Sequence, residues 1–201
     1  KGGGDKSMEK AYTTKQELRN RYLSYRNGLS AAKRKEKSEE IQKRLKQEPA
    51  FQKAEAVLVY MDYRSEVETS ALVEELLYSG EKRIFAPKVE GMNIRFYEII
   101  SMEDLKEGYQ GIREPEADRQ RLFTQEMSQE LKTLILVPGA VFDRQRGRMG
   151  YGKGFYDRYL AAFPALNSAA LAFECQIAKK VPEETHDKKT DMIITEAGVI
   201  K

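Results

Sequence analysis

A buried strand, a glycine-rich basic loop and the start of a helix follow one another in residues 134–160, LILVPGAVFDRQRGRMGYGKGFYDRYL. The apolar run 134–137 predicts the strand, which Pro138 and Gly139 end. Apolar side chains at 155, 156, 159 and 160 have helical spacing. The loop between strand and helix contains Arg144, Arg146, Gly147, Arg148, Gly150, Gly152, Lys153 and Gly154. Because bare backbone N–H groups and a helix amino terminus attract anions, this segment predicts a phosphate or nucleotide site.

The glycine spacing departs from two familiar phosphate-binding loops. Residues 147–153 fit G-x-x-x-x-G-K, but Gly154 follows where a P-loop has Ser or Thr to hold magnesium. The dinucleotide pattern G-x-G-x-x-G fails as well, because the third glycine comes one residue too early. A solvated surface loop is the alternative interpretation. Asp157, one turn into the helix, favours a nucleotide site, since magnesium on a nucleotide takes one or two carboxylates.

Two blocks of this region, VPGAVFD and GRMGYGKGFYDR, resemble the sequence pattern of the 5-formyltetrahydrofolate cyclo-ligase family, also called 5,10-methenyltetrahydrofolate synthetases. The resemblance spans residues 15–195, although only 137–157 is highly specific. Phe155 stands where many relatives have Tyr, and the position of Lys153 is Gly in many bacterial relatives. The resemblance implies an ATP- and Mg²⁺-dependent ligase that cyclises 5-formyltetrahydrofolate to 5,10-methenyltetrahydrofolate. ADP and phosphate would be released, through a phosphorylated formyl (imidate phosphate) intermediate.

ATP contacts are implied at the amino terminus and in the glycine-rich loop. Lys15 and Arg19 lie four residues apart on one face of a predicted helix, where a solvated pair is the plain interpretation. They match a K-x-x-x-R pair that contacts ATP phosphates in the family. The implied ATP-binding residues are Lys15, Arg19, Arg148, Gly150, Tyr151, Gly152, Lys153, Gly154, Phe155 and Tyr156. Of these, Arg148, Lys153 and Tyr156 are also the implied catalytic residues.

Folate contacts are implied after the first predicted strand, where Glu66 begins the family segment E-V-E-T. From the residues alone, this is an acidic loop leading into a helix. A carboxylate can accept hydrogen bonds from the N–H groups of a reduced pterin. The implied substrate-binding residues are Met61, Glu66, Tyr151, Gly152, Lys153, Gly154 and Phe155.

The resemblance implies magnesium ligands at Asp157 and Asp187. Asp191 is a second candidate for the latter position, and the sequence does not decide between the two. His186 is the only histidine, so it makes no zinc site without further ligands, and we interpret it as a loop residue. Gln176 is a weak candidate for the pocket, and Cys175 has no neighbour that would activate it.

Predicted strands alternate with predicted helices along the chain. Expected helices lie between the Thr14–Glu17 capping box and Gly28, at 31–47 after Ser30, at 70–78, 101–106 and 124–131, and from 155. Expected strands are 56–61, 83–89, 94–99, 134–137, 169–173 and 192–195, with 108–120 irregular. This order predicts an α/β fold, a single-domain three-layer α/β/α sandwich with a mostly parallel, Rossmann-like sheet. Ligands of such sheets bind at the carboxyl ends of strands, where the glycine-rich loop begins.

Within the first helix we expect Leu18, Tyr22 and Tyr25 to face inward, and in the second Ile41 and Leu45. The basic run 33–37 is interspersed with glutamates and is predicted to be a solvated helix face.

Length and charge exclude several classes of protein. The 201 residues suit one domain, expected at 8–201, with 1–7 as a disordered extension or cloning remnant before Met8. A net charge of +3, from 35 basic and 32 acidic residues, does not support binding to nucleic acid. No apolar run reaches the ~18 residues of a membrane helix. The single cysteine fits a reducing compartment, so we expect a cytoplasmic protein. We also expect a monomer or weak homodimer that binds small-molecule substrates.

Two other classes of protein remain open. One is a regulatory module that binds a nucleotide or phosphate without turnover, for which Glu66 would be dispensable. The other is an RNA-binding protein using the basic loop and its tyrosines, but the chain lacks the aromatic strand motif of such proteins.

Overall fold

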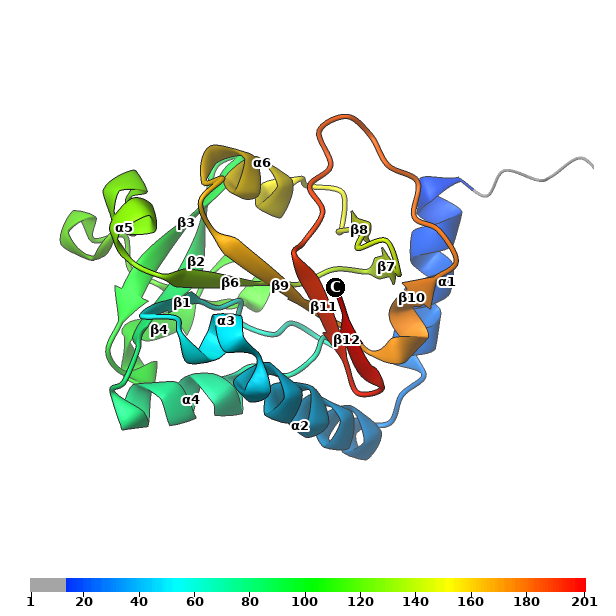
Figure 1. Cartoon of the computed structure of the whole chain (residues 1–201), viewed down its shortest axis with the longest axis horizontal. Coiled ribbons are helices and arrows are strands. Elements are labelled where there is room, and N and C mark those ends of the chain that lie inside the picture. The colour runs from blue at the N-terminus through cyan, green and yellow to red at the C-terminus, as the bar shows by residue number, and fades with distance from the viewer. Residues whose placement is uncertain (1–13) are drawn as a thin grey trace, which may run out of the picture.

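The computed structural model describes residues 14–201, so the expectations for residues 1–7 and Met8 lie outside the described part. The helices are α1 Lys15–Asn27, α2 Ala31–Gln47, α3 Pro49–Gln52, α4 Ser70–Ser79, α5 Gln125–Glu130 and α6 Phe155–Ala162 (Figure 1). The longer strands are β2 Arg83–Glu90, β3 Asn93–Ile99, β6 Thr133–Val137, β9 Asn167–Leu171 and β11 Met192–Thr195. The shorter strands are β1 Ala56–Leu58, β4 Leu105–Glu107, β5 Arg113–Pro115, β7 Val141–Asp143, β8 Arg148–Met149, β10 Ile177–Ala178 and β12 Gly198–Ile200.

Seven strands form the central sheet, in the order β12-β11-β9-β6-β1-β2-β3. The five inner strands pair in parallel, and the edge strands β3 and β12 run antiparallel to their neighbours. Every residue of β6 is buried, as expected of a parallel strand covered on both faces. The predicted mostly parallel sheet is therefore confirmed.

Helices cover both faces of this sheet, which confirms the three-layer prediction. On one face, Ile41 and Leu45 of α2 and Leu72 of α4 pack against the sheet. On the other face, Tyr159 and Leu160 of α6 pack against it. Figure 1 shows α2, α3 and α4 below the sheet and α6 above it. In the run 33–37 three residues are exposed and two are half-buried, so none belongs to this core, which agrees with the predicted solvated face.

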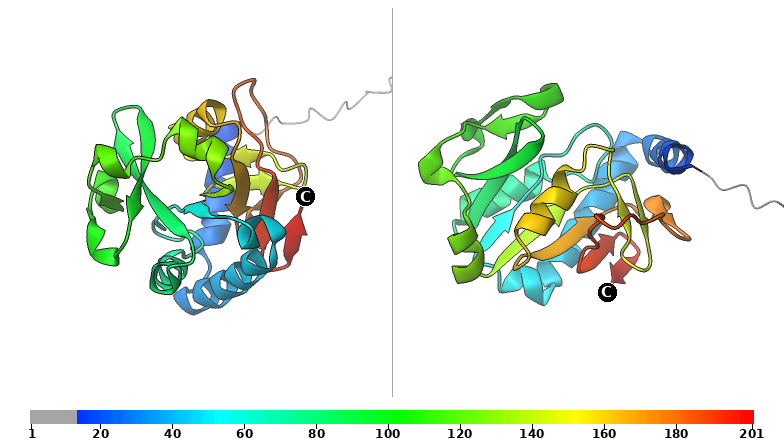
Figure 2. Two further views of the ribbon diagram at one scale, coloured as in Figure 1. Left: turned by 60° about the vertical axis from the view of Figure 1, so that its left-hand side comes forward. Right: turned by 90° about the horizontal axis from the view of Figure 1, so that it is seen from above.

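The first helix packs on a small second sheet instead of the central one. This sheet has the order β10-β7-β8, and Leu18 and Tyr22 of α1 contact its buried residues. Figures 1 and 2 place α1 at the end of the molecule opposite the β2–β3 hairpin. The inward orientation expected for Tyr25 is wrong, since 51% of the residue is exposed. Three strands cover only a narrow face of the helix, and in its last turn Arg26 is the buried residue.

Local sequence signals place most element boundaries correctly. Thr14 and Glu17 form the predicted capping box, and Ser30 Oγ accepts from the Lys33 N–H at the start of α2. The expected strand 56–61 is shorter, because only 56–58 pair on both sides. Val59 still donates to the Phe85 carbonyl of β2, and residues 59–61 stay buried. The expected helix at 101–106 is a 3₁₀ turn followed by β4, which pairs with β5 inside the segment expected to be irregular.

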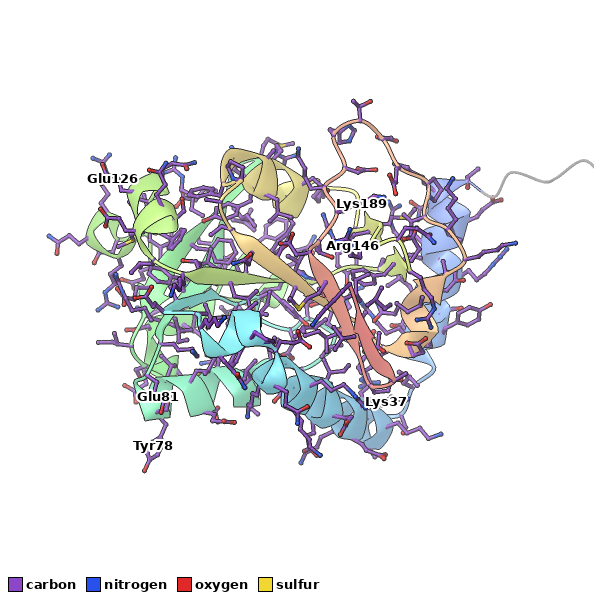
Figure 3. All side chains as sticks on the ribbon, viewed as in Figure 1. Lys37, Tyr78, Glu81, Glu126, Arg146 and Lys189 are labelled. Carbon is purple, nitrogen blue, oxygen red and sulfur yellow. The ribbon has the colours of Figure 1, made fainter. Side chains whose placement is uncertain are left out.

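The first half of the predicted loop is a β-hairpin. Strands β7 and β8 pair antiparallel, and Asp143 Oδ1 accepts from the backbone N–H groups of Gln145 and Gly147 in the turn. Gly147 therefore closes a hairpin and lies outside the phosphate-type loop. Arg146, labelled in Figure 3, donates to the carbonyl of Asp191, and Arg144 pairs with Glu174.

Side chains also join distant elements on the surface. Lys37 of α2, labelled in Figure 3, forms an ion pair of 2.5 Å with Glu196 in the β11–β12 turn. Within residues 14–201, no helix combines the length and the apolar character needed to cross a membrane.

Candidate active site

A cavity of about 810 Å³ opens at the carboxyl ends of β1 and β6. Its walls come from α1, from residues following β1, from β2 and β3, from the start of α6 and from the segment 182–187. This is the position predicted for a ligand site of a parallel sheet. The residues for which the resemblance implies contact with ATP, folate or magnesium all line it: Lys15, Arg19, Met61, Glu66, Arg148, Gly150, Tyr151, Gly152, Lys153, Gly154, Phe155, Tyr156, Asp157 and Asp187.

The glycine-rich loop of the cavity is the short segment 150–154. Gly152 and Gly154 have φ angles of 93° and 65°, in the left-handed region that favours glycine. Gly154 is the N-cap of α6, so the amino terminus of that helix begins in the cavity wall. Arg19 Nε donates to the Gly150 carbonyl across 2.9 Å and ties α1 to the loop. The loop thus presents backbone amides and a helix amino terminus, a combination that binds anions.

A buried ion pair lies beneath this loop. Arg148 Nη2 lies 2.7 Å from Asp157 Oδ1, and the same oxygen accepts from the Lys188 N–H at 3.1 Å. Arg148 is 6% exposed, and its Nε is buried with no hydrogen-bond partner among the described residues. Since Lys188 follows Asp187, this contact brings the segment carrying Asp187 to the carboxylate of Asp157.

Lys15 reaches the same segment from α1. Its Nζ lies 2.7 Å from Glu184 and 3.4 Å from Asp187. Burial lowers the pKa of Lys15, but the hydrogen bond to Glu184 and the two negative charges outweigh burial and leave that pKa raised. Lys15 therefore carries its positive charge at the rim of the cavity.

The two aspartates between which the sequence did not decide occupy different places. Asp187 lines the cavity. Asp191 lies outside it, where its Oδ2 accepts from the backbone N–H and the hydroxyl of Ser168. Of the two aspartates, Asp187 is therefore the one that shares the cavity with Asp157.

Glu66 is buried in the wall of the cavity. The Tyr151 hydroxyl donates to Oε1 across 2.5 Å, and the Tyr63 N–H donates to Oε2 across 2.9 Å. Burial raises the pKa of Glu66, and the hydrogen bond from Tyr151 and the charge of Arg26 oppose that rise. Tyr151 is 44% exposed as a residue, yet its hydroxyl forms hydrogen bonds with two buried side chains, those of Arg26 and Glu66.

Aromatic side chains line the space between these polar groups. Phe155 lies edge-on to Tyr109, with ring centroids 6.2 Å apart, and the Arg158 guanidinium lies 5.7 Å from the Phe155 ring. Burial raises the pKa of the Tyr156 phenol well above its ordinary value, so this hydroxyl keeps its proton at neutral pH. The cavity thus offers apolar surface that suits a flat ring, beside hydrogen-bonding groups.

Sequence reasoning missed several residues of the cavity wall, namely Arg26, Tyr109, Arg158 and Glu184. Arg26 had a usable signal, because it follows Arg19 by two helical turns and so shares its face. Glu184 lies in an irregular segment that carries no pattern. His186 is exposed in this segment, as expected of a loop residue, and it also lines the rim.

The two residues considered after β9 lie outside the cavity. Gln176 is buried and donates to the carbonyls of Gly139 and Ala140, so it supports the turn that follows β6. Its weak candidacy for the pocket is not supported by its position. Burial raises the pKa of the Cys175 thiol, which agrees with the expectation of an unreactive cysteine.

Comparison with known proteins gives one consistent family. A family model described as "5-formyltetrahydrofolate cyclo-ligase family" matches residues 11–196. A probable 5-formyltetrahydrofolate cyclo-ligase from Schizosaccharomyces pombe is 30% identical, over 76% of this chain and 80% of that protein. The 5-formyltetrahydrofolate cyclo-ligase of Escherichia coli K12 is 25% identical, over 87% and 96%. Among solved structures, 5,10-methenyltetrahydrofolate synthetase from Aquifex aeolicus is similar, with a TM-score of 0.81 and 34% identity, over 93% of this chain and 92% of that one.

Proposed function

The chain belongs to the 5-formyltetrahydrofolate cyclo-ligase family and is an enzyme of that class, and from this premise we propose that it uses MgATP to cyclise 5-formyltetrahydrofolate to 5,10-methenyltetrahydrofolate. The observation that carries the proposal is the composition of one cavity. It combines a phosphate-type loop with a buried carboxylate and an aromatic wall. A cavity of about 810 Å³ falls in the size range of small-molecule and cofactor sites.

In this proposal, the nucleotide phosphates lie at the rim formed by α1 and the glycine-rich loop. Lys15, Arg19 and Lys153 bring positive charge there, and the amides of 150–154 act as donors. Lys153 is exposed and forms no ion pair with any other described residue. Its ammonium group can therefore pair with the transferred phosphoryl group.

The folate lies between Glu66 and the aromatic wall. Glu66 accepts hydrogen bonds from N–H groups of the reduced pterin, as a carboxylate can. Met61 and Phe155 supply apolar contact for the ring, and the loop residues 151–154 lie where the two substrates meet.

The reaction demands alignment and charge neutralisation more than covalent work by the protein. The formyl oxygen attacks the γ-phosphorus of ATP, and ADP leaves. N10 then attacks the activated formyl carbon and loses its proton to solvent, the ring closes, and phosphate departs. Arg148, Lys153 and the protonated Tyr156 hydroxyl stabilise the charge that develops on the phosphoryl oxygens and on the leaving phosphate.

The donor atoms at the rim suit magnesium. Asp157 and Asp187 provide carboxylate oxygens, which are the ligands that Mg²⁺ prefers. Both contacts of Asp157 with described residues use Oδ1, so Oδ2 faces no competing donor among them. When bound, Mg²⁺ would neutralise phosphate charge at this rim. Glu184, His186 and Asp187 place their possible ligand atoms within 4.8 Å of one another, so Glu184 is a further candidate ligand beside Asp187, while Asp157 lies outside this cluster.

Counting products tests the proposal. With 5-formyltetrahydrofolate and MgATP, we expect ADP and cyclised folate in a one-to-one ratio, and no ADP when the folate is omitted or the magnesium is chelated. Binding of ATP without folate-dependent release of ADP would favour the regulatory module of the same fold. We place the enzyme in the cytoplasm, as a monomer or weak homodimer acting on these small molecules without nucleic acid or membrane.

A further inference from the structure

Arg26 is a buried cation in the wall of the cavity, and the proposed reaction assigns it no role. The residue is 3% exposed and lies in the last turn of α1. Its Nε donates to Ser65 Oγ across 2.9 Å, and its Nη1 donates to the Tyr151 hydroxyl across 2.6 Å and to the Gly139 carbonyl across 3.3 Å. One side chain thus joins α1, the segment before α4, the turn after β6 and the glycine-rich loop.

These contacts fix the direction of a hydrogen-bond chain. A guanidinium has donors only, so the Tyr151 oxygen must accept from Arg26. The phenolic proton is then directed to the nearest acceptor, Glu66 Oε1, at 2.5 Å. Ser65 Oγ likewise accepts from Arg26 and donates to Asn27 Oδ1. The chain of hydrogen bonds therefore runs from Arg26 through Tyr151 to Glu66.

We propose that Arg26 is a positioning residue for the folate: it holds the Tyr151 hydroxyl against Glu66 and places a positive charge beside this buried carboxyl group. Without this charge the buried Glu66 binds a proton more readily, and a protonated carboxyl loses acceptor capacity toward the pterin N–H groups. The inference rests on the proposed folate role of Glu66. It adds that α1 controls the folate half of the cavity as well as the nucleotide half.

The other charged and titratable groups around Glu66 do not replace Arg26. Tyr60 and Asp62 follow β1, Tyr151 lies in the glycine-rich loop, and Tyr156 belongs to α6. The tyrosines are neutral when protonated, and Asp62 opposes ionisation of Glu66. Among these neighbours Arg26 carries the positive charge, so its removal should raise the proton affinity of Glu66.

The test compares Arg26→Met, which keeps much of the length but no charge, with Arg26→Lys, which keeps the charge. Arg21→Met is the matched control, because Arg21 is exposed on the same helix and does not line the cavity. For Arg26→Met we expect the KM for 5-formyltetrahydrofolate to rise about tenfold at neutral pH. The rise should grow as pH falls, while the KM for ATP changes less than about twofold. Arg26→Lys should restore the pH profile but not the full affinity.

A measurement without substrate separates this inference from the proposed function. Carbon-13 NMR of the labelled glutamate carboxyls follows Glu66, assigned with Glu66→Gln, in the folded protein. Arg26→Met should shift the Glu66 titration to higher pH, and Arg21→Met should not. If Arg26→Met does not fold, Tyr151→Phe, which removes the hydrogen bond to Glu66 but keeps the charge of Arg26, is measured beside Arg26→Lys. The Glu66 titration should move to higher pH in Tyr151→Phe and stay near that of the wild type in Arg26→Lys. An unchanged Glu66 titration in Arg26→Met, or a proton affinity in Arg26→Lys above that of the wild type, overturns the inference. Absence of folate turnover in the wild type would instead remove the proposed function.

Discussion

Arg148 and Asp157 form an ion pair of 2.7 Å in which the arginine side chain is 3% exposed and the aspartate 15%. The pair links β8 to the first turn of α6 across the glycine-rich loop. The carboxylate proposed to bind magnesium is therefore held in place by the protein before any ligand arrives. Both of its contacts with described residues use Oδ1, so Oδ2 is left for the proposed metal, and hydrogen bonds that support a ligating carboxylate are typical of metal sites.

Asp157→Asn should raise the concentration of magnesium required for half-maximal activity, because the amide carries no charge for the metal. We expect an increase of about tenfold or more, in line with the loss of a charged interaction. The measurement is a magnesium titration of the cyclisation rate at saturating ATP and folate. An unchanged titration would remove Asp157 from the metal site. Asp191→Asn is the control, since Asp191 lies outside the cavity.

Lys153→Ala should weaken the use of ATP far more than the binding of folate. The exposed ammonium group reaches the rim of the cavity from the glycine-rich loop, and we expect a KM for ATP about tenfold higher. Steady-state kinetics with each substrate varied in turn provide the comparison. Lys179→Ala removes an exposed lysine outside the cavity and should behave as the wild type. Equal increases in both Michaelis constants would show that the two substrates do not divide the cavity in this way.

Glu66→Ala should weaken the binding of folate far more than the use of ATP. Loss of the buried carboxylate removes the acceptor for the pterin, so the KM for 5-formyltetrahydrofolate should rise at least about tenfold while that for ATP changes little. Glu68→Ala is the matched control, because Glu68 belongs to the same acidic segment and lies outside the cavity. A folate KM equal to that of the control would leave the regulatory module as the better account.

Glu66 should also make the stability of the protein depend on pH. Burial raises its pKa in the folded state above the ordinary value of 4.5, so the folded state retains the proton over a range where the unfolded chain has lost it. The free energy of unfolding contributed by this group therefore falls as pH rises from about 4.5 through the raised pKa, and then levels off.

Urea unfolding of the wild type and Glu66→Gln across this pH range measures the effect. The variant lacks the titrating group, so its stability relative to the wild type should increase with pH over the same interval. A difference that stays constant with pH would contradict a raised pKa for Glu66.

Local signals explain which elements could be predicted. The caps at Thr14 and Ser30 and the apolar run of β6 act over a few residues, and each specified its element almost to the residue. The glycines at 152 and 154 were also a local signal for the loop, because glycine tolerates the positive φ angles that both positions have. Resemblance to a family added Glu66 and Met61, which have no local pattern of their own.

The features that could not be predicted from the sequence depend on tertiary contacts. Strand β8 is two residues long and exists because Asp143 organises the turn before it. Asp187 lines the cavity and Asp191 does not, and the segment that carries Asp187 is held there by the Lys188 N–H, which reaches Asp157 from 31 positions along the chain. The burial of Arg26 requires partners from three other segments. Periodicity within one helix cannot reveal such partners.

The cyclisation itself is the most direct test of the account. Purified protein is mixed with 5-formyltetrahydrofolate and MgATP, and the absorbance band of the methenyl product is followed against controls that lack ATP or contain Glu66→Ala. We predict a rise that requires both substrates and is strongly reduced at low folate concentration in the variant. No rise in the wild type, while ATP still binds in a parallel titration, would contradict the proposed reaction.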